Sequence, residues 1–148
     1  MRESRKRARL KPEIGRGKMS AITLDSNAYS AFMRGDDRVL DEIARVEKVY
    51  LPLFVVGELH YGFRGGSRLR ENLRQLEQFL DKPSVKMWLP TAETAEIYGE
   101  LKDFLKRKGS PIPINDVWIA SAAIETGSKL VTFDQHFNVI PSLRVWDR

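Results

Sequence analysis

Apolar positions along the chain follow two different spacings. Short runs rich in apolar residues occupy positions 21–25, 48–51, 85–89 and 129–133. Between these runs, apolar residues recur every three or four positions, which is the period of an amphipathic helix. Short apolar runs that alternate with helices predict an α/β domain with an open, mainly parallel sheet. These runs are its four expected strands, and residues 143–146 are a candidate fifth strand.

Residue types that begin and end helices support this division of the chain. Ser67 and Thr91 each precede a stretch with helical periodicity, and both are of a type that caps helix N-termini. Gly127 follows the last such stretch, where a glycine commonly ends a helix. Helices that connect parallel strands cover both faces of the sheet, so we expect three layers, α/β/α. The expected helices cover residues 26–34, 36–47, 53–63, 68–80, 92–108 and 115–126.

Composition excludes several classes of function. The chain has 148 residues, a length typical of one domain. It contains no cysteine, which excludes a disulfide scaffold, a zinc–thiolate site, an iron–sulfur cluster and a cysteine nucleophile. Its two histidines, His60 and His136, are too few for a histidine-rich zinc site. No apolar run approaches the roughly 20 residues that span a bilayer, and the N-terminus lacks the apolar region of a secretion signal. We therefore expect a soluble, cytoplasmic protein with no membrane partner.

The positive net charge of the chain, +5, comes from its N-terminal segment. Residues 1–18 carry eight basic and two acidic side chains, a net charge of +6, which leaves the rest of the chain at −1. We expect residues 1–18 to be a disordered basic tail and residues 19–148 to form the domain. Such a tail can attract the phosphates of a nucleic acid. It can equally be a solvated extension, or a segment that precedes a true start at Met19.

Two acidic residues follow strands of the expected sheet. Asp25 ends the first apolar run, and Asp134 follows the fourth. The carboxyl ends of parallel strands share one edge of the sheet, and open α/β sheets bind their ligands at this edge. Each of the two acids could instead cap the segment that follows it. The positions of Asp25 and Asp134 therefore make them candidate site residues.

Two further acids interrupt the apolar faces of predicted helices. Asp116 lies in the first turn of its helix, on the same face as Ile119, and this helix end should reach the edge that holds Asp134. Glu58 interrupts another apolar stripe, about 9 Å from the start of its helix. As alternatives, Asp116 can stabilise the helix N-terminus through the dipole, and Glu58 can pair with Arg64 or another basic side chain. Both acids nevertheless point toward the same edge of the sheet.

Carboxylates that converge in a partly buried crevice must either take up protons or bind cations. No Lys or Arg lies within two residues of any of the four acids, so a divalent cation is the simplest counter-charge. Oxygen ligands suit Mg²⁺ or Mn²⁺ better than Zn²⁺. The sequence therefore predicts a metal site formed by Asp25, Glu58, Asp116 and Asp134.

The segments around these acids resemble the PIN-domain ribonucleases, and most closely the VapC-like toxins of bacterial and archaeal toxin–antitoxin pairs. The matching segments are 22–27 (ITLDSN), 56–62 (VGELHYG), 114–122 (INDVWIASA) and 130–137 (LVTFDQHF). Residues 143–146 resemble the closing strand of the family. The resemblance spans residues 20–148 and leaves the basic tail outside. Ser121 departs from the pattern, since many relatives have alanine at that position.

The resemblance implies a PIN-like fold and a metal-dependent endoribonuclease that hydrolyses RNA phosphodiester bonds as the toxin of a toxin–antitoxin pair. It places the catalytic, metal-binding quartet on Asp25, Glu58, Asp116 and Asp134 and implies Mg²⁺, with Mn²⁺ as a substitute. Asp116 or Glu58 would orient or deprotonate the attacking water. A cognate antitoxin and a homodimer are the implied partners. The alternatives are a PIN nuclease of RNA processing or decay and an inactive PIN-like binding module.

Other side chains carry weaker expectations. Thr132 can support the acidic residues or simply pack within its strand, and His136 is a minor candidate to assist near Asp134. An arginine cluster can hold RNA phosphates or form a solvated helix face; it consists of Arg64, Arg68, Arg70 and Arg74. The tryptophans are expected in the core; they are Trp88, Trp118 and Trp146.

Overall fold

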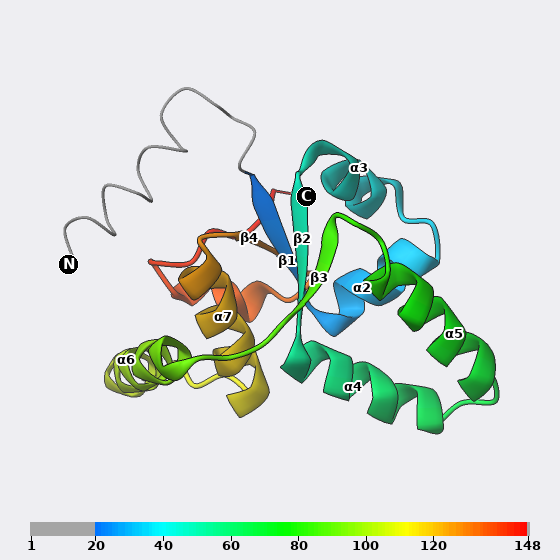
Figure 1. Ribbon diagram of the computed structural model, residues 1–148. Helices are drawn as coiled ribbons and strands as arrows, with labels where there is room; N and C mark the ends of the chain where they lie inside the picture. Colours follow the sequence, from blue (N-terminus) through cyan, green and yellow to red (C-terminus); the bar gives the residue numbers. More distant parts are fainter. Residues whose placement is uncertain (1–19, 148) are drawn as a thin grey trace.

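A sheet of four parallel strands forms the centre of the protein, as a computed structural model that describes residues 20–147 shows (Figure 1). The predicted tail at residues 1–18 lies outside this range. The strand order is β3-β2-β1-β4, so the first strand is central and borders the last. The strands are β1 (Ala21–Leu24), β2 (Lys48–Pro52), β3 (Val85–Trp88) and β4 (Lys129–Val131). An open, parallel sheet is thus confirmed.

Helices cover both faces of this sheet, which confirms the three expected layers. In Figure 1, α6 and α7 lie on one side of the sheet and α2, α3 and α5 lie on the other. Helix α4 runs along the carboxyl edge, at the bottom of the view, and contacts β2, β3, α2 and α7. The helices are α2 (Ser26–Met33), α3 (Asp37–Arg45), α4 (Leu53–Arg64), α5 (Leu69–Leu80), α6 (Ala92–Lys108), α7 (Ile114–Thr126) and the 3₁₀ helix η1 (Gln135–Val139).

The candidate fifth strand is reduced to a single bridge. Val145 pairs with Leu130 of β4, and two backbone hydrogen bonds flank the pair. The backbone N–H of Leu130 donates to the carbonyl of Arg144 over 2.8 Å, and that of Trp146 donates to the carbonyl of Leu130 over 3.0 Å. This short contact still matters, because it fastens the C-terminal segment to the strand that leads to Asp134.

Two of the predicted caps are confirmed and one is wrong. The Thr91 hydroxyl accepts the backbone N–H of Glu93 over 3.1 Å and begins α6. Gly127 ends α7 with a φ of 66°, a left-handed conformation that glycine adopts without strain. Ser67 does not cap α5, because that helix begins one residue later than such a cap requires and has Arg68 at the N-cap position with no side-chain cap.

The apolar core covers the central strand on both of its faces. Ile22 and Leu24 lie on one face of β1 and Thr23 on the other, and all three are fully buried. In β2, Val49 and Leu51 are fully buried on one face, and Tyr50 is half-buried on the other. Trp88 and Trp146 are buried as expected, whereas Trp118 is half-buried and stacks on Tyr98 with ring centroids 3.8 Å apart. Within residues 20–147, no helix is both long enough and apolar enough to cross a membrane.

Candidate active site at the carboxyl edge of the sheet

Asp25 sits at the point where the central strand β1 leads into helix α2. Its backbone is extended, and its Oδ1 accepts the backbone N–H of Ala28 over 2.8 Å, which makes it the N-cap of α2. Asp25 is 4% exposed, because neighbouring elements surround the end of a central strand. The capping role considered as an alternative is therefore real, but it occupies one carboxylate oxygen and leaves the other free for a second contact.

That second contact comes from Thr132, which lies just beyond β4. The Thr132 hydroxyl donates to Asp25 Oδ2 over 2.5 Å. The Thr132 Oγ1 atom also accepts the backbone N–H of Asp134 over 3.0 Å. Thr132 is fully buried, so these hydrogen bonds are shielded from water. The two acids that follow neighbouring strands are thus tied together by one hydroxyl group.

Asp116 approaches from the first turn of α7. Its Oδ2 lies 2.8 Å from Nε2 of His136, which belongs to the short 3₁₀ helix after Asp134. One ligand atom each from Asp116, Asp134 and His136 lie within 4.8 Å of one another. Helix α7 therefore brings its acid to the edge of the sheet that holds Asp134, as predicted from the position of Asp116 in the first turn.

The carboxylates influence one another electrostatically. Burial raises the pKa of Asp25 to about 6; the charges of Asp134 and Asp116 also raise it, and the hydrogen bonds from Thr132 and Ala28 oppose the rise. Burial also raises the pKa of Asp116, with an added contribution from Asp134, while His136 opposes this rise. The folded protein thus holds these carboxylates at a cost that comes mainly from burial and partly from charge repulsion, and a bound cation would offset both.

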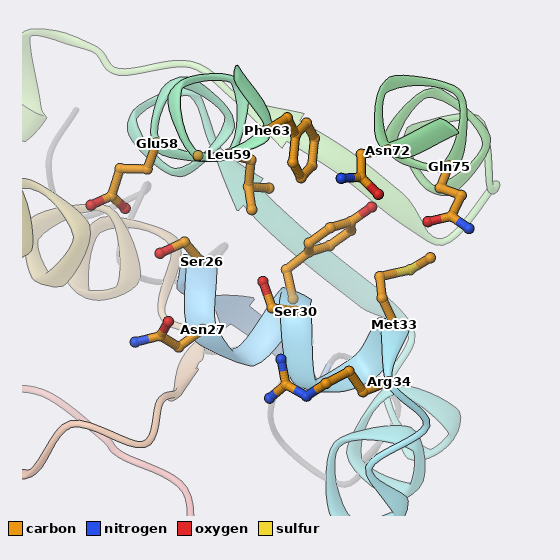
Figure 2. A pocket seen from close by; sticks show the side chains of 12 residues that line it. Ser26, Asn27, Ser30, Met33, Arg34, Glu58, Leu59, Phe63, Asn72 and Gln75 are labelled. Atoms are coloured by element: carbon orange, nitrogen blue, oxygen red, sulfur yellow. The ribbon is translucent and has the colours of Figure 1, made fainter. Parts of the chain in front are cut away.

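Glu58 lies next to this group, on α4. Its Oε1 is buried and has no hydrogen-bond partner within the described residues. Glu58 lines a pocket together with Ser26 and Asn27, the two residues that follow Asp25 (Figure 2). Across residues 20–147 no ion pair joins Glu58 to Arg64, so the alternative role for this acid is not found.

The match to known proteins decides the family. The model of the PIN domain matches residues 22–143. The chain belongs to the PIN-domain family. A curated relative, Ribonuclease VapC2 of Rickettsia felis, is 32% identical over 112 residues, which cover 74% of this chain and 82% of the relative. Ribonuclease VapC1 of Haemophilus influenzae strain R2866 is 25% identical over 129 residues, 84% of this chain and 95% of the relative.

Solved structures show the same PIN-domain fold. The complex VapBC2 from Rickettsia felis, bound to a DNA fragment from its promoter, contains a chain with a TM-score of 0.76 and 28% identity, and the match covers 85% of this chain and 97% of that one. A chain of DNA-bound VapBC from Salmonella typhimurium has a TM-score of 0.77 at 23% identity, with coverage of 87% and 98%. At 23% identity, the match to the Salmonella typhimurium chain supports the fold only.

The donor atoms of this PIN-domain site fit a hard divalent cation. Asp25, Asp116 and Asp134 supply carboxylate oxygens, and within residues 20–147 none of them forms an ion pair with a lysine or an arginine. Glu58 Oε1 is a further carboxylate oxygen, and it has no hydrogen-bond partner within the described residues. Mg²⁺ and Mn²⁺ prefer such oxygen-rich sites, and the imidazole of His136 is a ligand that Mn²⁺ also accepts.

Sequence reasoning placed His136 near Asp134 only as a minor candidate and missed its contact with Asp116. The residue is two positions from Asp134, but its contact is with Asp116, twenty residues away in the chain. The 3₁₀ helix that follows Asp134 turns the chain back toward α7 and creates this contact. The sequence offered one signal, a histidine close to an acid at the end of a strand, and that signal does not reveal the partner.

Proposed function

We propose that this PIN-domain protein is a metal-dependent endoribonuclease and the toxin of a toxin–antitoxin pair. The observation that carries the proposal is the grouping of Asp25, Asp116 and Asp134 at the carboxyl edge of the sheet, two of them with a raised pKa. A buried group of carboxylates destabilises a protein unless it binds something positive. The relatives named ribonucleases, with the same fold, support RNA as the substrate.

The metal-binding residues that we propose are Asp25, Glu58, Asp116 and Asp134, and the metal is Mg²⁺ or Mn²⁺. A bound divalent cation supplies a positive charge next to the scissile phosphate and lowers the pKa of a bound water. Without such a charge, the carboxylates repel a phosphodiester. The same acids that attract the metal therefore make RNA cleavage dependent on it.

Each acidic residue has a separate task in this proposal. Asp25 is held in one orientation by the Ala28 amide and the Thr132 hydroxyl, so it is a fixed ligand. Asp116 or Glu58 orients or deprotonates the attacking water, since both are half-buried acids and Glu58 Oε1 has no hydrogen-bond partner within residues 20–147. His136 contacts Asp116 Oδ2 and thereby sets the direction of that carboxylate. No covalent intermediate is needed.

The partner that we propose is a cognate antitoxin, and the assembly that we propose is a homodimer. The similar solved structures include VapBC complexes from Rickettsia felis, Haemophilus influenzae and Salmonella typhimurium. A toxin of this kind inhibits growth when it is expressed alone. Co-expression of the protein encoded beside it restores growth.

A cleavage assay tests the enzyme proposal. The purified chain is incubated with tRNA and mRNA in the presence of Mg²⁺, Mn²⁺ or EDTA. We expect internal cleavage with either cation and none in EDTA, with activity restored when cation is added in excess. Cleavage that persists in EDTA would contradict the metal-dependent mechanism. Binding without any cleavage would instead favour the inactive PIN-like module, and cleavage without growth inhibition would favour a nuclease of RNA processing or decay.

A further inference from the structure

A pocket of about 450 Å³ lies directly beside the acidic site, between helices α2, α4 and α5 (Figure 2). We call it the three-helix pocket. Glu58 and Ser26 line it, so the pocket and the proposed metal site share a wall. Its volume is within the range of small-molecule sites. A strand of RNA whose scissile phosphate lies at the acids must continue over neighbouring surface, and this pocket is part of it.

The α2 wall of the three-helix pocket is a polar stripe. Asn27, Ser30 and Arg34 lie three and four residues apart, so they share one face of the helix. Figure 2 shows the Arg34 side chain extending back along α2 beneath Ser30. Arg34 is exposed and forms no ion pair within the described part of the chain. At about 1.5 Å per residue, the backbones of Asn27 and Arg34 lie about 10 Å apart along the helix, and the extended Arg34 side chain brings its positive charge back toward Ser30.

The α5 wall carries two side-chain amides that have no partner within the described residues. Asn72 and Gln75 are one helical turn apart, both are half-buried, and neither amide is hydrogen-bonded within residues 20–147. An amide presents a donor and an acceptor side by side, which is the pattern found on the edge of a nucleobase. Phe63, on α4, adds an aromatic ring to the same pocket. Bases stack on such rings without sequence preference.

A buried hydroxyl in the same pocket also lacks a partner. Tyr29 is 2% exposed, and its hydroxyl has no hydrogen-bond partner in the described structure. Buried polar groups are nearly always paired, so an unpaired one indicates a ligand or a bound water. The unpartnered polar atoms within residues 20–147 thus gather around one cavity, since the other such buried atom is Glu58 Oε1.

We propose that the three-helix pocket holds an RNA nucleotide next to the cleaved bond, that Asn72 and Gln75 read its base, and that Arg34 binds a backbone phosphate. This proposal rests on the proposed ribonuclease function. Amides, hydroxyls and a cation line the pocket on two walls, and this chemistry suits a nucleotide better than an apolar peptide side chain. Asn72 and Gln75 are therefore specificity-determining residues, distinct from the acids that perform the chemistry.

Nucleotide binding without metal is the first test. The affinities of the full chain for the 5′-monophosphates of adenosine, cytidine, guanosine and uridine are measured by calorimetry in EDTA, where the bare carboxylates repel phosphate. We expect one nucleotide to bind best, and Gln75→Leu or Asn72→Leu to weaken it by at least about fivefold. Gln78→Leu is the matched control, because Gln78 is an exposed amide on the same helix outside the pocket. Absence of binding, or equal loss in the control, would overturn the proposal.

Cleavage specificity is the second test. An RNA pool with a randomised central segment is cut in Mn²⁺, and the bases that flank each cut are read by sequencing. We expect a base preference at one position that relaxes at least about fivefold in Gln75→Leu and not in Gln78→Leu. Arg34→Gln should instead weaken all sequences alike and make the dependence of affinity on salt shallower.

The two tests separate failure of this proposal from failure of the ribonuclease. If the wild type cuts no RNA, the enzyme proposal fails. The nucleotide-binding measurements then test by themselves whether the three-helix pocket holds a nucleotide. If the wild type cuts RNA but Asn72→Leu and Gln75→Leu leave both the base preference and the nucleotide affinity unchanged, the subsite is wrong. Loss of antitoxin capture in those same variants would then assign the pocket to a protein partner.

Discussion

The hydroxyl of Thr132 donates a hydrogen bond to Asp25 Oδ2 over 2.5 Å, across the ends of two neighbouring strands. It also accepts the backbone N–H of Asp134 over 3.0 Å. The indole N–H of Trp146 donates to the backbone carbonyl of Thr132 over 2.5 Å, so the C-terminal segment fixes the backbone at this point. One buried residue thereby sets the position of one acid relative to another and links the C-terminus to the site.

Removal of the Thr132 hydroxyl should reduce activity more than it disturbs the fold. Thr132→Val keeps the shape of the side chain but leaves Asp25 Oδ2 without its donor, so the carboxylate loses its fixed orientation. We expect RNA cleavage to fall by about 10–100-fold, the usual cost of losing a group that supports a metal ligand. Thr132→Ser retains the hydroxyl and should retain most of the activity. Equal activity in Thr132→Val and wild type would contradict this role.

Stability without metal should fall as pH rises from about 4 to about 7. The pKa of Asp25 is raised from 3.8 to about 6, so the folded state binds this proton more tightly than the unfolded chain. The contribution of Asp25 is therefore fully present below about pH 4 and is lost as pH passes through about 6. The difference corresponds to about 3 kcal/mol of unfolding free energy.

Urea unfolding in EDTA measures this effect. The unfolding free energy of the wild type should fall relative to that of Asp25→Asn over the same pH range, since the variant has no proton to lose at this site. The raised pKa of Asp116 adds to the decline in both proteins. Parallel curves for the two proteins would show that Asp25 titrates normally.

Mn²⁺ should stabilise the wild type more than Asp25→Asn. A ligand that binds only the folded state raises its stability by an amount that grows with the ratio of ligand concentration to Kd. Loss of one carboxylate removes a ligand and also relieves repulsion in the metal-free protein. We therefore expect a higher metal-free Tm and a smaller Mn²⁺-induced rise in Asp25→Asn. Equal rises in Tm for both proteins would place the cation elsewhere.

Asp116→Asn should abolish RNA cleavage and growth inhibition while the fold persists. The substitution keeps the size of the side chain but removes the charge next to Asp134 and His136. We expect cleavage in Mg²⁺ to fall by at least about 100-fold. Asp103→Asn, at an exposed position on α6, is the matched control and should cut like the wild type. A near-normal rate in Asp116→Asn would remove Asp116 from the active site.

A chain that begins at Met19 should fold and retain metal-dependent cleavage. Strand β1 begins at Ala21, so the shortened chain contains every element found in residues 20–147. The segment removed carries a charge of +6, which should supply much of any non-specific attraction to RNA. We expect a shallower slope of log affinity against log salt. An unfolded or inactive product at low salt would show that residues 1–18 are part of the domain.

The sequence by itself determined the order of the elements and the edge at which the chemistry lies. Apolar runs fix strands and helical periodicity fixes helices, because both depend on neighbours within a few residues. Asp25 and Asp134 could be placed at the carboxyl edge since each follows a predicted strand and parallel strands share that edge. Asp116 could be placed there from the direction of its helix.

Only the tertiary structure decided how these groups meet. The contact of His136 with Asp116, the bridge from Thr132 to Asp25 and the unpartnered oxygen of Glu58 all depend on residues far apart in the chain. Local patterns contain no information on such distances, because small changes in the packing of α7 or in the turn after β4 would separate the side chains. The raised pKa of Asp25 likewise arises from burial by the surrounding elements. This burial depends on tertiary packing, so the sequence around Asp25 does not reveal it.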